Sequence, residues 1–520
     1  MPEGGTQPAA DGGVPMLSSI NPLTGEELGR VPTLGPDRVG ALVAECRADQ
    51  ARWARRSVRE RARSLVRLRE LIAGRAQEIA QLVRAETGKA LGEALGGEVL
   101  VACDYLAYLE RIAPFALSGR RAGTGFFAHR RARVVYEPYG VVAAITPWNY
   151  PFTISLGVVA TAVAAGNGVI LKPSEYTPLI GVRVAELLAE ATGLEKLVVV
   201  ATGDGRTGAA LVRAGVDKIA FTGSVATGRA VMAAAAESLT PVVLELGGKD
   251  AMIVCSDADV ERAARGAVWG AFYGCGQICQ SVERVYVVES IYDAFVRAAV
   301  AEARRVRTGD EPEAMIGSLI APFQLEKMES HIRDAVERGA RVLLGGRRLE
   351  LPGHFFEPTV ITDVDHSMEL MRTETFGPVL PIMRVRDEDE AVRLANDTEY
   401  GLDASIWSRN HSKARAMAER LDVGTVLIND HLINYAMAEL PFGGTRHSGF
   451  GRVHGLEGLR ELVRPKSLVE DRLAIGREPH WFGKDGSGEG WALNLLELRH
   501  GRGALRRVRA ALKLVRSFGR

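Results

Sequence analysis

Cys279 is the residue of this chain best suited to act as a nucleophile. It follows a short turn, Gly276-Gln277-Ile278, at the end of a stretch of small residues. A lone cysteine is usually a buried small hydrophobe, and that alternative stays open here. A reactive thiolate forms where backbone amides stabilise negative charge, and the glycine-glutamine turn could provide such a place. Cys275 lacks this lead-in.

Glu245 could serve such a nucleophile as a base. It ends the apolar run 241–244 and is followed by Leu246-Gly247-Gly248-Lys249. A carboxylate in this position is either paired with a nearby cation such as Lys249 or held where a raised pKa serves proton transfer. The residues alone leave both alternatives open.

Asn149 could donate a hydrogen bond to a developing oxyanion. It lies in Pro147-Trp148-Asn149-Tyr150-Pro151, a turn bracketed by two prolines after an apolar run. An amide fixed in such a turn can stabilise negative charge on oxygen. An ordinary turn is the alternative.

Three further segments have the character of nucleotide-binding loops. Phe221-Thr222-Gly223-Ser224 offers a hydroxyl and backbone amides at an expected helix start, suited to a pyrophosphate. Lys172 and Glu175, after another apolar run, could both bond ribose hydroxyls. A helix cap and a surface ion pair are the respective alternatives. Residues 203–208 spell GxGxxG, but no ribose-binding acid follows about 20 residues later, so this loop is weak evidence.

The bulk composition fits a globular protein without a strong electrostatic preference. The chain has 520 residues, 47% of them hydrophobic, which is enough for about three domains. With 65 Lys and Arg against 64 Asp and Glu, no global field favours nucleic acid. Five scattered cysteines without zinc-ligand spacing predict no metal site and indicate a reducing cytoplasm.

Neither the N-terminal segment nor the most apolar stretch of the chain has the pattern of a secretory signal or a membrane span. Residues 1–15 are rich in Gly and Pro, lack a basic start and are expected to form a disordered tail. The most apolar stretch, 141–171, is interrupted by Pro147, Asn149, Pro151 and Asn167, so it lacks the uninterrupted run that spanning requires.

Alternating elements are expected to position these residues. Leu65, Leu68, Leu71, Ile72, Ile79 and Leu82 recur at helical spacing between Pro36 and Gly88, which predicts amphipathic helices. Two series of strands then alternate with helical stretches, at 141–145, 168–171, 197–200, 218–221 and 242–245, and at 283–288, 341–344, 379–385 and 424–428. This rhythm predicts two α/β domains with parallel strands, separated near Gly247 and Gly248.

These motifs together resemble the aldehyde dehydrogenase superfamily. From about Ser18 to Arg472 the chain carries PWNYP, KPSEYTP, FTGS, LELGGKD, GQIC, ETFGPV, NDTEYGL and PFGGTRHSGFGR in the family's order. The 34 residues from Glu245 to Cys279 also match the family's usual spacing.

The resemblance implies an α/β fold with two Rossmann-like domains and a small β element for oligomerisation. The implied domains are residues 16–246 for NAD binding, with a β-hairpin near 118–139 for assembly, 247–440 for catalysis, and 441–472 as a return to the first region. An extension, 473–520, follows. A homo-oligomer is expected.

The resemblance also implies a role for each matching residue. Cys279 would be the nucleophile of a thiohemiacetal and then a thioester, Asn149 and the Cys279 N–H the oxyanion hole, and Glu245 the base that activates the hydrolytic water. Lys172 and Glu175 would hold the adenosine ribose, Ser224 the pyrophosphate, and Glu374 the nicotinamide ribose beside Phe376. The other expected cofactor-binding residues are Thr146, Pro147, Trp148, Ser174, Gly205, Phe221, Thr222, Gly223, Thr227, Leu246 and Gly247. Because Glu175 would repel a 2′-phosphate, NAD is favoured over NADP, with NADP still possible.

Two alternatives to this interpretation stay open, another enzymatic activity and a non-catalytic role. A CoA-acylating dehydrogenase would use the same Cys279, but water activated by Glu245 would compete for the thioester. A non-catalytic scaffold of the same fold fits poorly with Cys279, Asn149 and Glu245 all present.

The chain departs from the family in two places. Val453 follows Gly451-Arg452 where many hydrolytic members carry a glutamate, and Gly157 stands where several relatives place a larger residue, which predicts a roomier substrate tunnel. Ser281-Val282-Glu283 and the basic C-terminus are similar to a bacterial branch that includes succinate-semialdehyde dehydrogenases. No Arg lies near Gly157 to pair with that substrate, so the aldehyde stays open.

The last segment, 504–520, predicts a basic amphipathic helix. Leu505, Val508, Leu512, Val515 and Phe518 are expected along one side, with Arg506, Arg509, Lys513 and Arg516 opposite and no acidic residue. Peripheral attachment to an anionic membrane is one interpretation. A helix packed on the protein's own surface or on a partner subunit is the other.

Overall fold

The computed structural model describes residues 15–473, 478, 481 and 489–517. The expected tail at 1–15 therefore lies outside the described residues except for Pro15. The chain divides into two compact units: the first consists of the residues up to Ser118 and Tyr136–Pro465, and the second of Gly119–Val135 and Lys466–Arg520. Each unit is described by itself.

A six-stranded sheet forms the first half of the first unit. Its order is β17-β9-β8-β5-β6-β7, with β5 (Val141–Ile145), β6 (Gly168–Lys172), β7 (Val198–Val200), β8 (Lys218–Thr222), β9 (Val242–Glu245) and β17 (Gly449–Phe450). β5 to β9 are parallel, whereas β17 returns from far along the chain and pairs antiparallel with β9. Because both faces are covered, β5 and β6 are buried throughout their length, and their residues are apolar apart from Lys172 at the end of β6.

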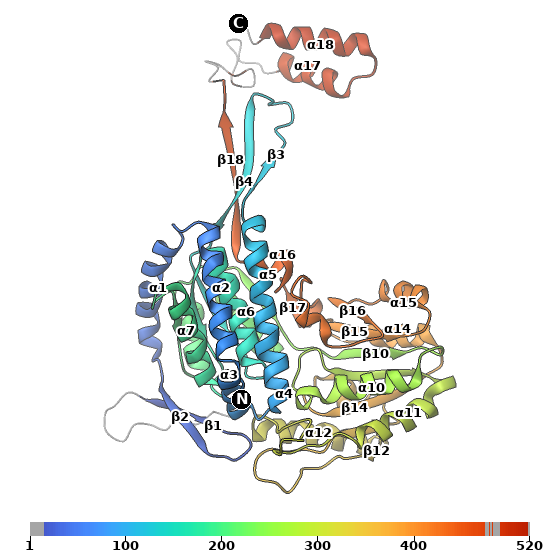
Figure 1. The fold of residues 1–520 in the computed structure, drawn as a ribbon. Helices are drawn as coiled ribbons and strands as arrows, with labels where there is room; N and C mark the ends of the chain where they lie inside the picture. The colour runs from blue at the N-terminus through green and yellow to red at the C-terminus, as the bar shows by residue number, and fades with distance from the viewer. Residues whose placement is uncertain (1–14, 474–477, 479–480, 482–488, 518–520) are drawn as a thin grey trace. The chain divides into compact units, whose positions relative to one another are not determined.

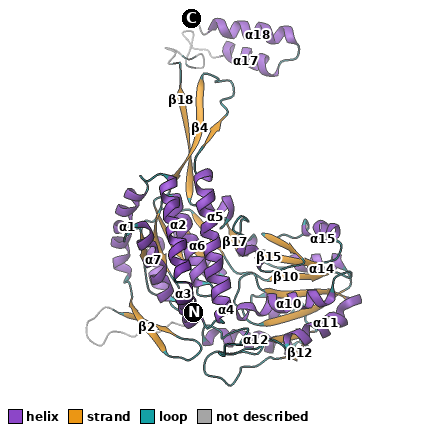
Figure 2. Ribbon diagram, in the orientation of Figure 1, coloured by secondary structure: helices purple, strands orange, loops and turns teal. Residues whose placement is uncertain are grey.

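Helices cover this sheet on both faces (Figure 2). The connecting helices are α6 (Pro151–Ala165), α7 (Pro178–Thr192), α8 (Gly205–Arg213) and α9 (Val225–Ala236). Before them come β1 (Met16–Ile20), β2 (Glu27–Pro32), α1 (Val39–Trp53), α2 (Val58–Gly74), α3 (Ala76–Thr87) and α5 (Val101–Ala116). The amphipathic pattern expected there is confirmed, since Leu65, Leu68, Ile72 and Ile79 are buried and Leu71 and Leu82 pack partly buried against the same core.

A seven-stranded sheet forms the second half of the first unit. Its order is β12-β13-β14-β11-β10-β15-β16, with β10 (Asp250–Val254), β11 (Val282–Val288), β12 (Arg341–Leu344), β13 (Thr359–Thr362), β14 (Val379–Val385), β15 (Asp403–Trp407) and β16 (Thr425–Ile428). Its helices include α10 (Val260–Phe272), α11 (Glu289–Ala303), α12 (Pro322–Glu337), α14 (Glu388–Asn396) and α15 (His411–Ala418). The expectation of parallel strands throughout is wrong at the edge: β12 pairs antiparallel with β13, because the two are joined by a loop with no crossover helix.

The second unit combines a narrow sheet with two helices (Figure 1). β3 (Arg120–Ala122) and β4 (Arg130–Pro138) form the expected antiparallel hairpin, and β18 (Val463–Asp471) adds to β4. α17 (Glu489–His500) and α18 (Ala504–Ser517) follow. The α/β class with two sheets and a small β element is confirmed, while the residue limits assigned to the functional domains stay predictions. Among the described helices, none combines the length and apolarity needed to cross a bilayer.

Candidate active site

A cavity of about 510 Å³ lies at the edge where the parallel strands of the first sheet end. β5, β6, β8 and β9 finish there at Ile145, Lys172, Thr222 and Glu245, and this is the edge at which α/β sheets bind ligands. Every site residue expected from the sequence lines this cavity: Cys279, Glu245, Asn149, Thr146, Pro147, Trp148, Lys172, Ser174, Glu175, Gly205, Phe221, Thr222, Gly223, Ser224, Thr227, Leu246, Gly247, Glu374 and Phe376. The sequence did not single out Tyr176, Phe323, Gln324 and Lys327, which line it as well.

Cys279 faces this cavity from the loop before β11. Its half-buried side chain contrasts with that of Cys275, which is 2% exposed and belongs to the core. Gly276 makes the loop possible, because it has a φ of +68° and a Cβ there would lie 2.2 Å from the carbonyl oxygen of Gly377. The turn named in the sequence is therefore a close backbone approach that seats the cysteine.

Electrostatics keep Cys279 protonated until a base acts. Burial, and then the carboxylates of Glu245, Asp250 and Asp403, raise the pKa of the Cys279 thiol well above its usual range. Burial also raises the pKa of Glu245 to about 8, although contact with the Cys279 thiol works against this. Such a carboxyl exchanges protons near neutral pH, as a general base must.

Glu245 is not held by a cation. Lys249, the partner considered from the sequence, instead pairs with Glu283 and donates a hydrogen bond to Thr375 Oγ1 at 3.2 Å. The Oε1 atom of Glu245 has no hydrogen-bond partner within the described residues. Of the two alternatives for Glu245, the geometry favours the carboxyl available for proton transfer.

The buried Lys249–Glu283 pair lies against the loop of Glu374 and Phe376, two residues expected to bind the cofactor. The Glu283 carboxylate accepts hydrogen bonds from the backbone N–H groups of Thr375, at 2.7 Å, and Phe376, at 2.8 Å. Gly248 N–H donates to Glu374 Oε1 at 3.0 Å. The loop that carries Glu374 and Phe376 is thereby fixed against the ends of β10 and β11.

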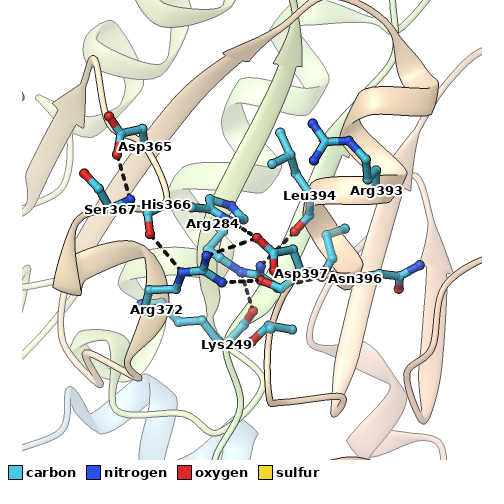
Figure 3. A network of polar contacts seen from close by, with 12 residues as sticks. Lys249, Arg284, Asp365, His366, Ser367, Arg372, Arg393, Leu394, Asn396 and Asp397 are labelled. Atoms are coloured by element: carbon cyan, nitrogen blue, oxygen red, sulfur yellow. Dashed lines mark hydrogen bonds and ion pairs between the residues drawn. The ribbon is translucent and has the colours of Figure 1, made fainter.

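Arg284 supports this pair from the core of the second sheet (Figure 3). It donates from Nε to the carbonyl oxygen of Lys249 at 2.8 Å and from its terminal nitrogens to those of Leu394 and Ala395, at 3.2 and 3.0 Å. Nearby, Asp397 binds His366 at 2.8 Å and Arg372 at 3.1 Å. Sequence reasoning missed these supporting charges. Their one signal is that Glu283 and Arg284 interrupt an otherwise apolar strand.

Asn149 is held on two sides. Its Nδ2 donates to the carbonyl oxygen of Gln277 at 2.9 Å, which leaves the second amide hydrogen for another acceptor. The Glu98 carboxylate accepts the N–H groups of Phe152 and Thr153, at 2.9 and 3.0 Å, at the start of α6. Negative charge is favourable at a helix N-terminus, so Glu98 anchors the turn that carries Asn149. No motif or spacing in the sequence pointed to Glu98.

The helix cap and the ion pair expected as alternatives in the nucleotide segments are both present. Ser224 caps α9 by accepting the Thr227 N–H at 3.3 Å, and Lys172 Nζ lies 3.4 Å from Glu175 Oε2. Gly205 begins α8, which Asp204 caps. The cap and the ion pair therefore exist, yet their members also line the cavity. The cap and the ion pair therefore do not exclude a contact with a ligand, because Ser224, Lys172 and Glu175 each line the cavity.

An apolar cluster reaches the cavity of Cys279 through Ile154. Tyr150, Ile154, Ile278 and Leu432 form a cluster with Tyr273 and Tyr435. Behind it, a small cavity of about 30 Å³ is lined by Glu245, Gly157 and Val453 among others. The position where many relatives carry a glutamate is thus occupied here by an apolar side chain beside the proposed base.

Comparisons with known proteins identify the family of the chain. Residues 10–468 match the model of the aldehyde dehydrogenase family. The chain is 40% identical to a 4,4'-diapolycopene aldehyde oxidase of Methylomonas sp. over 508 residues, covering 96% of this chain and 95% of that protein. It is 39% identical to a betaine aldehyde dehydrogenase of Cereibacter sphaeroides over 452 residues, or 86% of this chain and 92% of that one.

A solved structure extends the likeness to the fold. The NAD-dependent aldehyde dehydrogenase of Sinorhizobium meliloti is 37% identical and superposes with a TM-score of 0.86, covering 91% of this chain and 94% of that one. None of these three proteins is named as a succinate-semialdehyde dehydrogenase, so that narrower resemblance stays a prediction. With the family model spanning most of its length, the chain belongs to the aldehyde dehydrogenase family and is an oxidoreductase that oxidises an aldehyde to the acid with NAD.

Proposed function

We propose that Cys279 is the nucleophile of this dehydrogenase, with Asn149 as oxyanion donor and Glu245 as base. The observation that supports this most is the meeting of these three side chains on one cavity, with the residues suited to a dinucleotide around the rest of it. Asn149 and Gln277 connect the oxyanion donor to the loop of the nucleophile.

The first half of the reaction forms a bond to sulfur. Glu245 accepts the proton of the Cys279 thiol and passes it to solvent, and the thiolate attacks the aldehyde carbon. The carbonyl oxygen of the resulting thiohemiacetal carries the negative charge, which the free Asn149 amide hydrogen and the Cys279 N–H stabilise. NAD supplies the acceptor for the hydride that then leaves this carbon, and a thioester on Cys279 remains.

The second half releases the acid. Glu245 removes a proton from a water molecule, whose oxygen attacks the thioester carbon. The carbon–sulfur bond breaks, the carboxylic acid departs and Cys279 is regenerated.

The cofactor residues divide into three groups along the cavity. Lys172 and Glu175 would bind the adenosine ribose, and Ser224 with the N-terminus of α9 would bind the pyrophosphate. Glu374 would bind the nicotinamide ribose, beside Phe376. Glu175 supports a preference for NAD because a carboxylate repels a 2′-phosphate.

The experiment is NADH formation with an aldehyde panel, with and without CoA, for the wild-type protein, Cys279→Ala and the control Cys103→Ala. We expect turnover without CoA in the wild type and the control and none in Cys279→Ala. Turnover only with CoA would favour the acylating alternative, and activity in Cys279→Ala would refute the assignment of the nucleophile.

We further propose that the aldehyde is apolar. The support is the aromatic and aliphatic cluster beside Cys279, and the name of the Methylomonas relative, which acts on a polyene aldehyde. The test is kcat/KM for long apolar aldehydes against betaine aldehyde and succinate semialdehyde. A higher value for either charged substrate would contradict the proposal.

A cytoplasmic homo-oligomer completes the proposal. Five free cysteines fit a reducing compartment, and the β3–β4 hairpin with β18 offers strand edges for assembly. Light scattering coupled to size-exclusion chromatography tests the assembly, and a monomeric mass would contradict it.

A further inference from the structure

The last helix of the second unit, α18, has three faces of different chemistry. Ala510 and Leu514 are buried, 3% and 6% exposed, on the face toward α17, with which α18 forms a helical hairpin (Figure 1). Leu505, Val508, Leu512 and Val515 are between 56% and 78% exposed. Their spacing of three and four residues places them along one stripe of the helix, which we call the apolar stripe.

A basic stripe lies beside the apolar one. Each of its members, Arg506, Arg509, Lys513 and Arg516, follows a member of the apolar stripe by one residue, and successive residues differ by about 100° around a helix. The expectation that these cations lie opposite the apolar residues is therefore corrected: they adjoin them. Within the described part of the chain, none of the four forms an ion pair with an acid.

The packing of α18 bears on the two interpretations of this helix, attachment to a membrane and packing on the protein itself. The helix does pack on its own unit, but through Ala510 and Leu514, and Arg507 donates to the carbonyl oxygens of Leu498 and Arg499 of α17, both at 2.9 Å. All four side chains of the apolar stripe stay more than half exposed, although Val515 also lines a cavity of about 360 Å³ within this unit. Phe518, expected on the same stripe, lies outside the described residues.

We infer that this face of α18 docks on an anionic lipid bilayer. The apolar stripe would enter the acyl boundary, and the adjoining arginine and lysine side chains would reach lipid phosphates while their stems stay in the apolar layer. A single stripe of four side chains gives weak, reversible attachment, which the four cations strengthen on negative lipid only.

Charge distinguishes the bilayer from a second copy of the chain. α18 has no acidic residue between Ala504 and Ser517, so a symmetric contact between two such faces would set one basic stripe against another. A surface of anionic headgroups complements both stripes at once. The inference is separate from the chemistry proposed for Cys279, because the second unit contains none of the proposed catalytic residues.

The experiment is co-sedimentation of the full-length protein with vesicles of phosphatidylcholine alone and of phosphatidylcholine with phosphatidylglycerol. The wild type should co-sediment with the anionic vesicles and dissociate from them at high salt. Leu505→Ser/Leu512→Ser should weaken binding about 100-fold, and Arg506→Gln/Lys513→Gln about 30-fold on anionic vesicles alone. The matched control is Leu239→Ser/Leu351→Ser, which removes two exposed leucines of the first unit and should bind as the wild type does.

Two outcomes would overturn the inference. One is that the wild type and Leu505→Ser/Leu512→Ser show the same co-sedimentation with anionic vesicles, whether both bind or neither does. The other is a lower molar mass of Leu505→Ser/Leu512→Ser in light scattering, with no vesicle binding by the wild type, which would assign the face to a contact between copies. Turnover of a water-soluble aldehyde should be unchanged in all these variants, so loss of docking and failure of the catalytic proposal are told apart.

Discussion

The Asn149 side chain donates a hydrogen bond to the carbonyl oxygen of Gln277 at 2.9 Å, two residues before Cys279. The amide is thereby fixed in orientation by the loop of the cysteine it is proposed to assist. One amide hydrogen is committed to this bond, and the other is left for the substrate oxygen.

Replacing Asn149 should therefore affect the chemical step. We expect Asn149→Ala to lower kcat by about 100- to 1000-fold, the usual cost of removing one oxyanion donor. The KM for NAD should change little. Asn149→Asp, which keeps the size but loses the Nδ2 donor, should be similarly impaired. Steady-state kinetics check this, and near-normal turnover in either variant would remove Asn149 from the oxyanion hole.

The proposed base makes turnover depend on pH. The pKa of Glu245 is raised to about 8, so the carboxyl is mostly protonated below this pH and becomes an active base above it. kcat should rise between pH 7 and pH 9. In Glu245→Gln it should fall by about 100- to 10,000-fold, and the rise should disappear. A pH profile of the variant that parallels the wild type would assign the titration to another group.

The buried Lys249–Glu283 ion pair should contribute both to the free energy of unfolding and to NAD binding. Removing one partner of a buried ion pair costs about 3 to 5 kcal/mol, so Lys249→Met should lower the free energy of unfolding by that amount. It should also raise the KM for NAD, because the loop of Glu374 and Phe376 loses an anchor.

An exposed pair provides the control for Lys249→Met. Asp334 of α12 and Arg338, which caps the end of this helix, form an exposed ion pair at 2.7 Å, and Arg338→Met should leave both the free energy of unfolding and the KM for NAD nearly unchanged. Denaturant unfolding and NAD titration measure both variants. An unchanged KM in Lys249→Met would show that the pair serves the fold alone.

Cofactor choice should depend on Glu175. Removing like-charge repulsion toward a 2′-phosphate should raise kcat/KM for NADP in Glu175→Ser about tenfold to a hundredfold relative to NAD. Glu186→Ser removes an equal charge from α7 at a residue outside the cavity and should leave the ratio unchanged. A wild-type preference for NADP would contradict the role given to Glu175.

The sequence predicted most of the first sheet because its strands are apolar runs of the kind that parallel strands require. In the second sheet, the prediction from the sequence missed β10, β13 and β15. β13 begins and ends with a threonine, and β15 begins with an aspartate and contains a serine, so neither stands out as an apolar run. β10 follows Gly247-Gly248-Lys249 so closely that the motif conceals the start of a strand.

The supporting side chains were beyond sequence reasoning for another reason. Glu98 and Phe152 are 54 residues apart, and Lys249 and Glu283 are 34 apart. A buried charge is destabilising unless an oppositely charged or hydrogen-bonding partner lies close to it. The sequence does not show which distant residue becomes that partner. Motifs identify the residues proposed to meet substrate, whereas the residues that hold them in place have no motif of their own.

The strand that ends in Glu245 gains its second neighbour late in synthesis. β9 is flanked on one side by β8, which precedes it, and on the other by β17, where Gly449 pairs with Glu245. A nascent chain exposes Cys279 long before residue 449 leaves the ribosome, and until then the carboxyl beside the cysteine belongs to an open sheet edge. If Glu245 is the base proposed here, the pairing of its strand is among the last contacts that translation supplies, and a chain released before residue 449 carries the proposed nucleophile beside an incomplete sheet edge.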